Sequence, residues 1–304
     1  MNSVRRLSGT GLKSFERPAW LPAKVWPFDL WSVQVDDLQV TITDIGRGPT
    51  LVFYTGIGSF VWRDVMVQLS GSFRCITLDP PGIGLSGPIS PSEATLRRSA
   101  AAVTAVMRAL ELTDVTLVVH DSGGPPALAA AARRPDRIRG IVGVNTFGWR
   151  PSGTAFRGML ALMGSRFIRR FSISTGALAS LTATTFGAGR HLDAAGREAY
   201  RTGFRKSMTV FHDYLRDARD SDLYDEIAAG LEGPLKHLPL LTIFGERNDP
   251  LHFQPRWKAL FPAARQIVIP KGNHFPMCDA PDVVADEVGR WHRECVLRAQ
   301  EHRS

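Results

Sequence analysis

The chain has 304 residues, a hydrophobic content of 44% and a charged content of 22%, which are typical of a globular protein and exclude a disordered or fibrous one. No stretch approaches the roughly 20 apolar residues that cross a bilayer, and no apolar run follows the basic N-terminus, so neither a membrane span nor a secretory signal is predicted. The net charge of +8 allows an anionic partner. However, the arginines match no nucleic-acid motif, so no nucleic-acid partner is expected.

The cysteines and the missing motifs indicate the compartment and the kind of chemistry. Cys75, Cys278 and Cys295 are odd in number and far apart, as expected of free thiols in a reducing compartment. We therefore expect a cytoplasmic protein. No pair of cysteines has zinc-ligand spacing, and no known metal-binding motif occurs, so no metal is implied.

The first 148 residues alternate between strand and helix patterns. Residues 1–30, rich in proline and containing two tryptophans, suggest an arm packed on the domain. The alternating stretch 31–46 predicts an antiparallel hairpin. Further predictions are buried strands at 49–56, 73–82, 115–124 (ending in a sharp turn) and 138–148, and helices at 92–111, with Ser92 as N-cap, and at 125–136.

The alternation of strand and helix patterns stops at residue 149 and resumes near residue 233. Residues 149–232 contain amphipathic, helix-like stretches and no convincing strand. Strand patterns resume at 237–249 and 264–276, and a final helix is expected at 281–299. The sequence thus predicts an α/β fold: a mostly parallel sheet with helices on both faces, formed by 31–148 and 233–304 and interrupted by a helical cap, 149–232.

Three chemically capable residues follow predicted strands. Asp121, Asp249 and His274 each come just after a strand, and the carboxyl ends of parallel strands form the ligand-binding edge of such sheets. A nucleophile, an acid and a histidine, in this chain order, are typical of the α/β-hydrolase arrangement. The alternative for His274 is a turn histidine held by the backbone.

The segment VVHDSGGPPA is the strongest signal. A nucleophile elbow needs small residues around it, and Gly123 and Gly124 follow Asp121 at the crowded positions. Val119, two residues before, is larger than usual there. The alternative is that Asp121 is only the N-cap of the next helix.

From about Trp20 to Trp291 the chain resembles the haloalkane dehalogenase and epoxide hydrolase branch of the α/β-hydrolase superfamily. FRCITLDPPGIGLSGP is similar to that branch's D-x-x-G-x-G-x-S segment, and VVHDSGG to its H-D-W-G-G elbow. GNHFP resembles the catalytic-histidine segment, and PTLVFYTGIGSFVWRDV the H-G-N-P oxyanion loop followed by W-R.

The chain departs from the branch at the halide-binding positions. Ser122 stands where the branch has tryptophan, and Ile57 where it has asparagine; Thr55 and Gly58 replace the histidine and proline of the same loop. Ile57 has no side-chain donor and Ser122 a short one, which puts dehalogenation in doubt. The backbone N–H groups of Ile57 and Ser122 would still form the oxyanion hole that the resemblance implies.

The resemblance implies a two-step hydrolysis of a small hydrophobic substrate by water. Asp121 would attack an sp³ carbon to form an alkyl ester, and His274, oriented by Asp249, would activate the water that hydrolyses it. Glu246 competes with Asp249, while Asn145, at another acid position of relatives, cannot carry the charge. His120 is expected to point away as a supporting residue. For an epoxide, a cap tyrosine, Tyr200 or Tyr214 or, near the end of the cap, Tyr224, would donate the proton to the leaving oxygen.

Two other interpretations stay open. Ser122 could attack an ester carbonyl, although His120 would then occupy a position that needs a small residue. Alternatively, the chain is a non-catalytic ligand-binding homologue. The pattern Gly82-x-Gly84-x-x-Gly87 matches a dinucleotide fingerprint. However, prolines precede it and no helix start follows, so no cofactor is expected.

Overall fold

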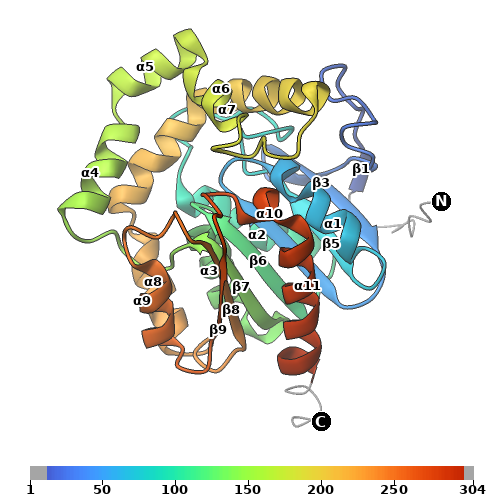
Figure 1. Cartoon of the computed structure of the whole chain (residues 1–304), viewed down its shortest axis with the longest axis vertical. Coiled ribbons are helices and arrows are strands. Elements are labelled where there is room, and N and C mark those ends of the chain that lie inside the picture. Colours follow the sequence, from blue (N-terminus) through green and yellow to red (C-terminus); the bar gives the residue numbers. More distant parts are fainter. Residues whose placement is uncertain (1–11, 298–304) are drawn as a thin grey trace.

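A nine-stranded sheet forms the centre of the computed structural model, which describes residues 12–297 (Figure 1). Its strand order is β1-β2-β3-β5-β4-β6-β7-β8-β9. The strands are β1 (Leu12–Ser14), β2 (Trp31–Val35), β3 (Leu38–Gly46), β4 (Thr50–Thr55), β5 (Arg74–Leu78), β6 (Val115–Asp121), β7 (Ile138–Thr146), β8 (Leu240–Gly245) and β9 (Arg265–Ile269).

The pairing of the strands changes once across the sheet, from antiparallel to parallel. The first strands, β1 to β3, pair antiparallel with one another, and β3 pairs antiparallel with β5. From β5 through β4 to β9 every pairing is parallel. The predicted hairpin and the mostly parallel sheet are both confirmed. Of the predicted arm, residues 1–11 lie outside the described residues, and the first described stretch adds β1 to the edge of the sheet.

The central strands are buried because helices cover both faces of the sheet. Every residue of β6 before Asp121 is buried, as expected for its continuous apolar sequence. Helices α1 and α11 pack together over one face, and α2, α3 and α8 pack together over the other. The core helices are α1 (Arg63–Leu69), α2 (Leu96–Ala109), α3 (Gly124–Arg133), α9 (Phe253–Leu260), α10 (Pro276–Asp279) and α11 (Pro281–Trp291), with single turns at Ser59–Trp62, Pro135–Arg137 and His292–Leu297.

The N-terminus of α2 differs from the prediction. Ser92 lies in a turn, and the N-cap is Thr95, whose hydroxyl accepts a hydrogen bond from the Arg98 N–H. Asp217, from the distant helix α7, accepts a second bond from the Leu96 N–H at 2.8 Å. Because two side chains satisfy these free N–H groups, the helix begins at residue 96 rather than 92.

Helices α4 to α8 fill the whole interval between β7 and β8, and no strand occurs among these described residues, as the sequence predicts. The longest, α7, crosses the top of the molecule behind α4 to α6 (Figure 1). No helix among residues 12–297 is both long and apolar enough to span a bilayer. The five helices are α4 (Thr154–Met163), α5 (Arg166–Thr175), α6 (Ala177–Thr182), α7 (Ala194–Asp220) and α8 (Leu223–Glu232).

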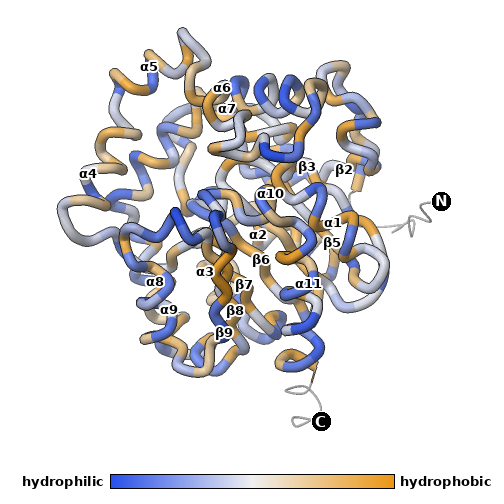
Figure 2. The backbone as a smooth tube through the Cα atoms, in the orientation of Figure 1, coloured by the Kyte–Doolittle hydropathy of each residue, from blue (hydrophilic) through white to orange (hydrophobic). Residues whose placement is uncertain are grey.

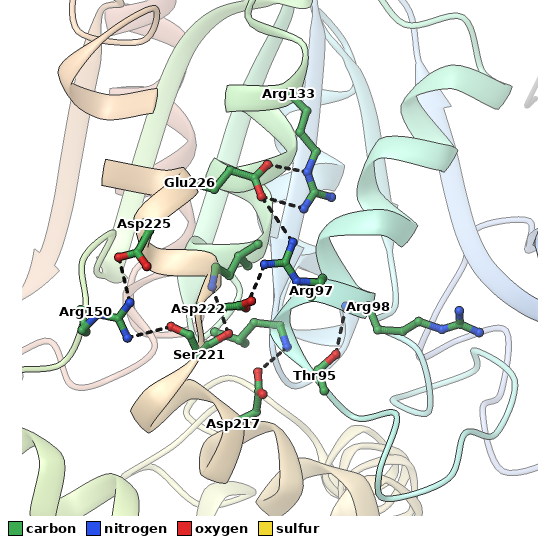
Figure 3. A network of polar contacts seen from close by, with 12 residues as sticks. Thr95, Arg97, Arg98, Arg133, Arg150, Asp217, Ser221, Asp222, Asp225 and Glu226 are labelled. Carbon is green, nitrogen blue, oxygen red and sulfur yellow. Dashed lines mark hydrogen bonds and ion pairs between the residues drawn. The ribbon is translucent and has the colours of Figure 1, made fainter. Parts of the chain in front are cut away.

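Helix α8 lies against the sheet's own helices although the sequence places it in the cap. A Cβ at Gly230 would meet the Cβ of Ala132 at 2.6 Å, so α8 and α3 touch almost backbone to backbone. Glu226 accepts two hydrogen bonds from Arg133, at 2.6 and 3.0 Å, and pairs with Arg97 as well (Figure 3). This network joins α8 to both α2 and α3, so α8 gives the insertion a fixed base.

Candidate active site

Asp121 occupies a strained turn between β6 and α3. Its φ of 49° is unusual for a residue with a side chain, and the strain lifts that side chain out of the strand. A Cβ at Gly123 would lie 2.5 Å from the Thr55 Cα, and one at Gly124 would lie 2.0 Å from the Thr146 Oγ1. Only glycine fits at either position, for the reason expected of a nucleophile elbow.

The carboxylate of Asp121 does not cap the following helix. The N-cap of α3 is Gly123, and within residues 12–297 this cap has no side-chain hydrogen bond. Instead the main chain of Asp121 is fixed from the next strand, since the Thr146 hydroxyl donates to the Asp121 carbonyl at 2.6 Å. The carboxylate is therefore available for other partners.

His274 lies beside this carboxylate. Its Nε2 is 3.7 Å from Oδ1 of Asp121, longer than a hydrogen bond but short enough to share one water or tighten on binding. The two side chains are 34% and 26% exposed, so both can be reached from outside. The structure thus brings two of the three predicted catalytic residues together at the carboxyl edge of the sheet.

The backbone of His274 is held by two buried side chains. The His274 carbonyl accepts hydrogen bonds from Nε2 of His120 and from Nδ2 of Asn145, both at 2.9 Å. Asn145 also donates to the Asn273 carbonyl and accepts from the Gly245 N–H. It therefore fixes the histidine loop to β8 by its amide, a role that needs no charge.

His120 is a neutral support with a defined tautomer. Because its Nε2 donates to a carbonyl, its Nδ1 accepts from the Thr55 hydroxyl, 3.0 Å away. Burial, together with the neighbouring His274, lowers the pKa of His120 to about 3. The imidazole thus stays uncharged at neutral pH, and its ring points to the backbone of His274 rather than toward Asp121.

The electrostatics around Asp121 favour its anion. Burial raises the pKa of this carboxyl, but the neighbouring His274, with smaller effects from His120 and the Ser122 N–H, outweighs burial and leaves the pKa below its usual range. An ionised carboxylate at the mouth of a turn is the form that can attack carbon.

The ring nitrogen of His274 that faces away from Asp121 meets Asn248, not Asp249. Its Nδ1 is 3.1 Å from Nδ2 of Asn248. The Asp249 carboxylate instead accepts from the N–H groups of Phe253 and Gln254, at 2.6 and 3.0 Å, where α9 begins. Among the described residues the structure does not bring this carboxylate to His274.

Glu246, the other acid considered, also lies apart from the histidine. Its carboxylate accepts a hydrogen bond from the Lys271 N–H at 2.7 Å. No sequence signal distinguished Asn248 from its neighbours. Only the path of the loop after β8 decides which of these side chains reaches His274.

Asp79 holds the loop that carries Ile57 in place through hydrogen bonds. This buried carboxylate accepts from the N–H groups of Ser59 and Leu85, both at 2.7 Å, and a Cβ at Gly84 would meet it at 2.2 Å. The glycine pattern at 82–87 therefore wraps a structural aspartate. Ser122, across the site, places its hydroxyl 3.3 Å from Oδ2 of Asp121.

The tyrosines predicted as proton donors have other surroundings. The Tyr214 hydroxyl donates to the Pro81 carbonyl at 2.8 Å, and that of Tyr224 to the Ala218 carbonyl. Tyr200 is buried with its ring against Phe60 and Phe204, beside an apolar cavity that Ile57 also lines. Burial raises the pKa of all three phenols, which opposes ionisation.

Comparison with known proteins identifies the family of the chain. The alpha/beta hydrolase fold family matches residues 49–281, which is most of the chain. The chain belongs to this family. The turn at Asp121 and the loop of His274 both lie within the matched residues, and the predicted fold class is confirmed.

Relatives within the α/β-hydrolases are those that the sequence motifs indicated. Haloalkane dehalogenase 2 of Mycobacterium tuberculosis is 26% identical over 272 residues, covering 86% of this chain and 94% of that protein. An epoxide hydrolase of Caballeronia sordidicola is 29% identical over 38% of this chain and 36% of its own. The resemblance to this branch is therefore confirmed, at low identity.

Solved structures agree on the fold. Haloalkane dehalogenase DbeA from Bradyrhizobium elkani superposes with a TM-score of 0.73 at 21% identity, covering 86% of this chain and 96% of that one. A Vigna radiata epoxide hydrolase variant superposes with the same score at 20% identity, covering 88% and 99%. By its family and its curated relatives, this α/β-hydrolase is an enzyme of the hydrolase class.

Proposed function

We propose that this protein hydrolyses a small hydrophobic substrate with Asp121 as nucleophile. The observation that carries the proposal is the position of the Asp121 carboxylate on the strained elbow, 3.7 Å from Nε2 of His274. A non-catalytic binding protein has no need for a base next to a carboxylate in such a costly backbone conformation.

In the first step, an oxygen of Asp121 attacks an sp³ carbon of the substrate from the side opposite the leaving atom. The new C–O bond forms as the bond to the leaving halide or alkoxide breaks, and the electron pair departs with that atom. The product is an alkyl ester on Asp121. The side chain of Ile57 has no hydrogen-bond donor for a leaving halide, and that of Ser122 has only a short one. We therefore favour breakage of a carbon–oxygen bond.

In the second step, Nε2 of His274 takes a proton from a water, which attacks the carbonyl carbon of the ester. The oxygen that becomes negative belongs to Asp121, and the N–H groups of Ile57 and Ser122 would stabilise it. Collapse of the intermediate expels the alkoxide, which takes the proton from His274 and leaves as the alcohol. The Asp121 carboxyl, now with one oxygen from water, releases its remaining proton to solvent and is again a carboxylate.

Asn248, rather than Asp249, would orient His274 in this cycle. A His274 that accepts a proton at Nε2 carries its other proton at Nδ1. Asn248 accepts that proton through its amide oxygen after a half-turn of the amide. Asp249 would then stabilise the start of α9 by its two backbone bonds.

Two matched variants separate these roles. If Asp249 only stabilises the start of α9, Asp249→Asn should leave kcat within about tenfold and lower stability by about 1 kcal/mol, since the amide oxygen can accept one of the two backbone hydrogen bonds but not both. If Asp249 is the triad acid, the same change should lower kcat by about 10⁴-fold. Asn248→Asp should raise the rate of ester hydrolysis under our proposal, because a carboxylate stabilises the imidazolium better than an amide.

The decisive experiment follows heavy oxygen from water in a single turnover. The substrate panel should hold epoxides, haloalkanes, aryl esters and an oxetan-2-one, because a cis-3-alkyl-4-alkyloxetan-2-one decarboxylase of Shewanella oneidensis is also 26% identical over 270 residues. Label should enter the Asp121 carboxylate, and Ser122→Ala should still turn over. Turnover with no label at Asp121 and loss of activity in Ser122→Ala would instead establish the serine mechanism.

The third outcome concerns the non-catalytic alternative. No turnover of any panel member, combined with saturable binding of one of them that Asp121→Ala does not weaken, would identify a ligand-binding homologue. Tight binding that disappears in Asp121→Ala would leave the carboxylate as the centre of the site but reject hydrolysis.

A further inference from the structure

Helices α4 to α6 expose an unusual number of large apolar side chains. Phe167 is 76% exposed and Phe186, just after α6, is 75% exposed. Six of the ten large apolar side chains that are exposed among residues 12–297 belong to this short part of the chain: Met159, Leu162, Phe167, Phe171, Leu181 and Phe186. Such a concentration marks an interaction surface rather than ordinary surface scatter.

The same segment is strictly basic. Residues 151–192 contain five arginines and not one aspartate or glutamate. Three of these arginines pair with acids from elsewhere in the chain: Arg157 with Asp220, Arg169 with Asp213 and Arg190 with Asp279. Arg166 and Arg170 are exposed and have no ion pair within the described part of the chain.

Helix α5 combines both features. Phe167 and Phe171 are one turn apart and form one exposed ridge, while Arg166 and Arg170 form the next. The α5 helix projects at the edge of the molecule, and hydrophobic and hydrophilic stretches alternate along α4 and α5 (Figure 2). An amphipathic helix with aromatic residues beside arginines is suited to lie in a membrane interface.

A hollow at the start of α5 adds a second, independent feature. It is lined by Arg166 together with Arg216 and Arg219 of α7, with Leu160 at its apolar side. Arg216 and Arg219 also contact the carboxylates of Asp213 and Asp220, so the hollow is partly neutralised. Three arginine residues that line one hollow, of which Arg166 precedes the exposed Phe167, suit a phosphate headgroup whose acyl chains lie beside it.

We propose that the surface of α4 to α6 docks onto a membrane rich in anionic phospholipid. The exposed phenylalanines and leucines would enter the apolar boundary, and Arg166 and Arg170 would contact the phosphates. The protein would bind at the surface without crossing it. This inference does not depend on the reaction at Asp121, so either can fail alone.

Vesicle sedimentation tests the proposal with the full chain. Wild type should bind vesicles of equal parts phosphatidylcholine and phosphatidylglycerol, bind pure phosphatidylcholine much more weakly, and be released by salt. Both F167S/F171S and R166E/R170E should lower the partition constant at least tenfold, because each removes one of the two attractions. Thermal melts should show that both variants remain folded.

Matched controls use exposed residues far from this surface. R108E/K236E changes the net charge as much as R166E/R170E, and V67S/V283S removes exposed apolar side chains from α1 and α11. Both controls should bind like wild type. Controls that are as impaired as the α5 variants would show only a general charge or apolarity effect and overturn the proposal.

Three further outcomes would also overturn it. If wild type binds neither kind of vesicle but forms a dimer, and F167S/F171S is monomeric, the surface is a contact between two copies of this chain. Release by glycerol phosphate at the lipid's concentration would indicate a soluble phosphate ligand. Equal binding to an oligonucleotide, insensitive to F167S/F171S, would indicate a general polyanion surface.

Discussion

The edge of the sheet at Asp121 and helices α4 to α6 differ in how tightly they are packed. Around Asp121 the main chain is strained, glycines leave no room for a Cβ, and His120 and Asn145 fix the histidine loop. In α4 to α6, phenylalanines and leucines face outward and Gly158 has nothing within 4 Å of the place of a Cβ. A rigid site and a surface with loosely packed apolar groups suit chemistry and docking, respectively.

The largest expected effect is on catalysis at Asp121. Asp121→Asn keeps the shape but removes the anion that attacks carbon, so we expect turnover to fall by about 10³-fold or more. F167S/F171S should leave turnover of a water-soluble substrate within about twofold, because these side chains lie on the outside of the insertion. Initial rates on the same panel member check both.

Trapping distinguishes this loss from simple misfolding. In His274→Gln the first step remains possible while the water lacks its base, so the alkyl ester should accumulate and raise the intact mass by the alkyl fragment. A folded His274→Gln protein that turns over substrate at the wild-type rate would contradict the role of His274. Asp121→Asn should show no added mass.

The next effect is on folding at the elbow. A methyl group at position 124 would lie 2.0 Å from the Thr146 Oγ1 and 2.8 Å from the Phe147 carbonyl oxygen. Gly124→Ala should therefore lower the free energy of unfolding by about 3 kcal/mol or more, since the backbone cannot yield easily. Urea unfolding measures this loss. If Gly124→Ala unfolds at the same urea concentration as wild type, α3 can shift away from β7.

The sequence was sufficient for the sheet and for the sharp turn at Asp121 because both depend on local patterns. Continuous apolar runs can be buried only under helices, and the two glycines after Asp121 allow only one kind of turn there. The segment 149–232 was predicted as helical from its periodicity. Its large exposed side chains were not, because helical spacing shows that a face is apolar but not whether the fold covers it.

The histidine partner could not be predicted, for a different reason. Asn248 and Asp249 are neighbours in one loop, and both types are common at turns and helix starts. Which of them meets His274 depends on where α9 begins, and the free N–H groups of Phe253 and Gln254 attract the carboxylate. The N-cap of α2 was missed similarly, since Asp217 comes from a helix more than a hundred residues away.

A smaller effect concerns the pH dependence of stability. It tests the role of His120, which holds the backbone of His274 in place. The folded pKa of His120 is about 3, against an ordinary value of 6.5, so the unfolded chain binds a proton more readily. The stability that neutral His120 contributes is therefore complete above pH 6.5 and is lost as the pH falls toward 3. His120→Gln should remove up to about 1.4 kcal/mol per pH unit of this slope.

Urea titrations through this acidic range, with His237→Gln as control, check the slope. His237 is exposed, so its replacement controls for the loss of a histidine as such. Buried His292, whose pKa is lowered to about 4, should keep part of the slope in every variant. An unaltered slope in His120→Gln would mean that His120 takes up a proton in the folded protein.

The smallest effect is a gain of stability in α4. Gly158 lies exposed within this helix, with open space where a Cβ would be, so Gly158→Ala gains helix propensity without any clash. We expect about 0.5–1 kcal/mol of added stability by urea unfolding, with no change in turnover. Because Gly124→Ala makes the same chemical change with the opposite sign, the pair measures directly how differently the two regions are packed. Equal effects at both positions would show that α4 is as tightly enclosed as the elbow, and would remove the contrast between the site and the outer helices.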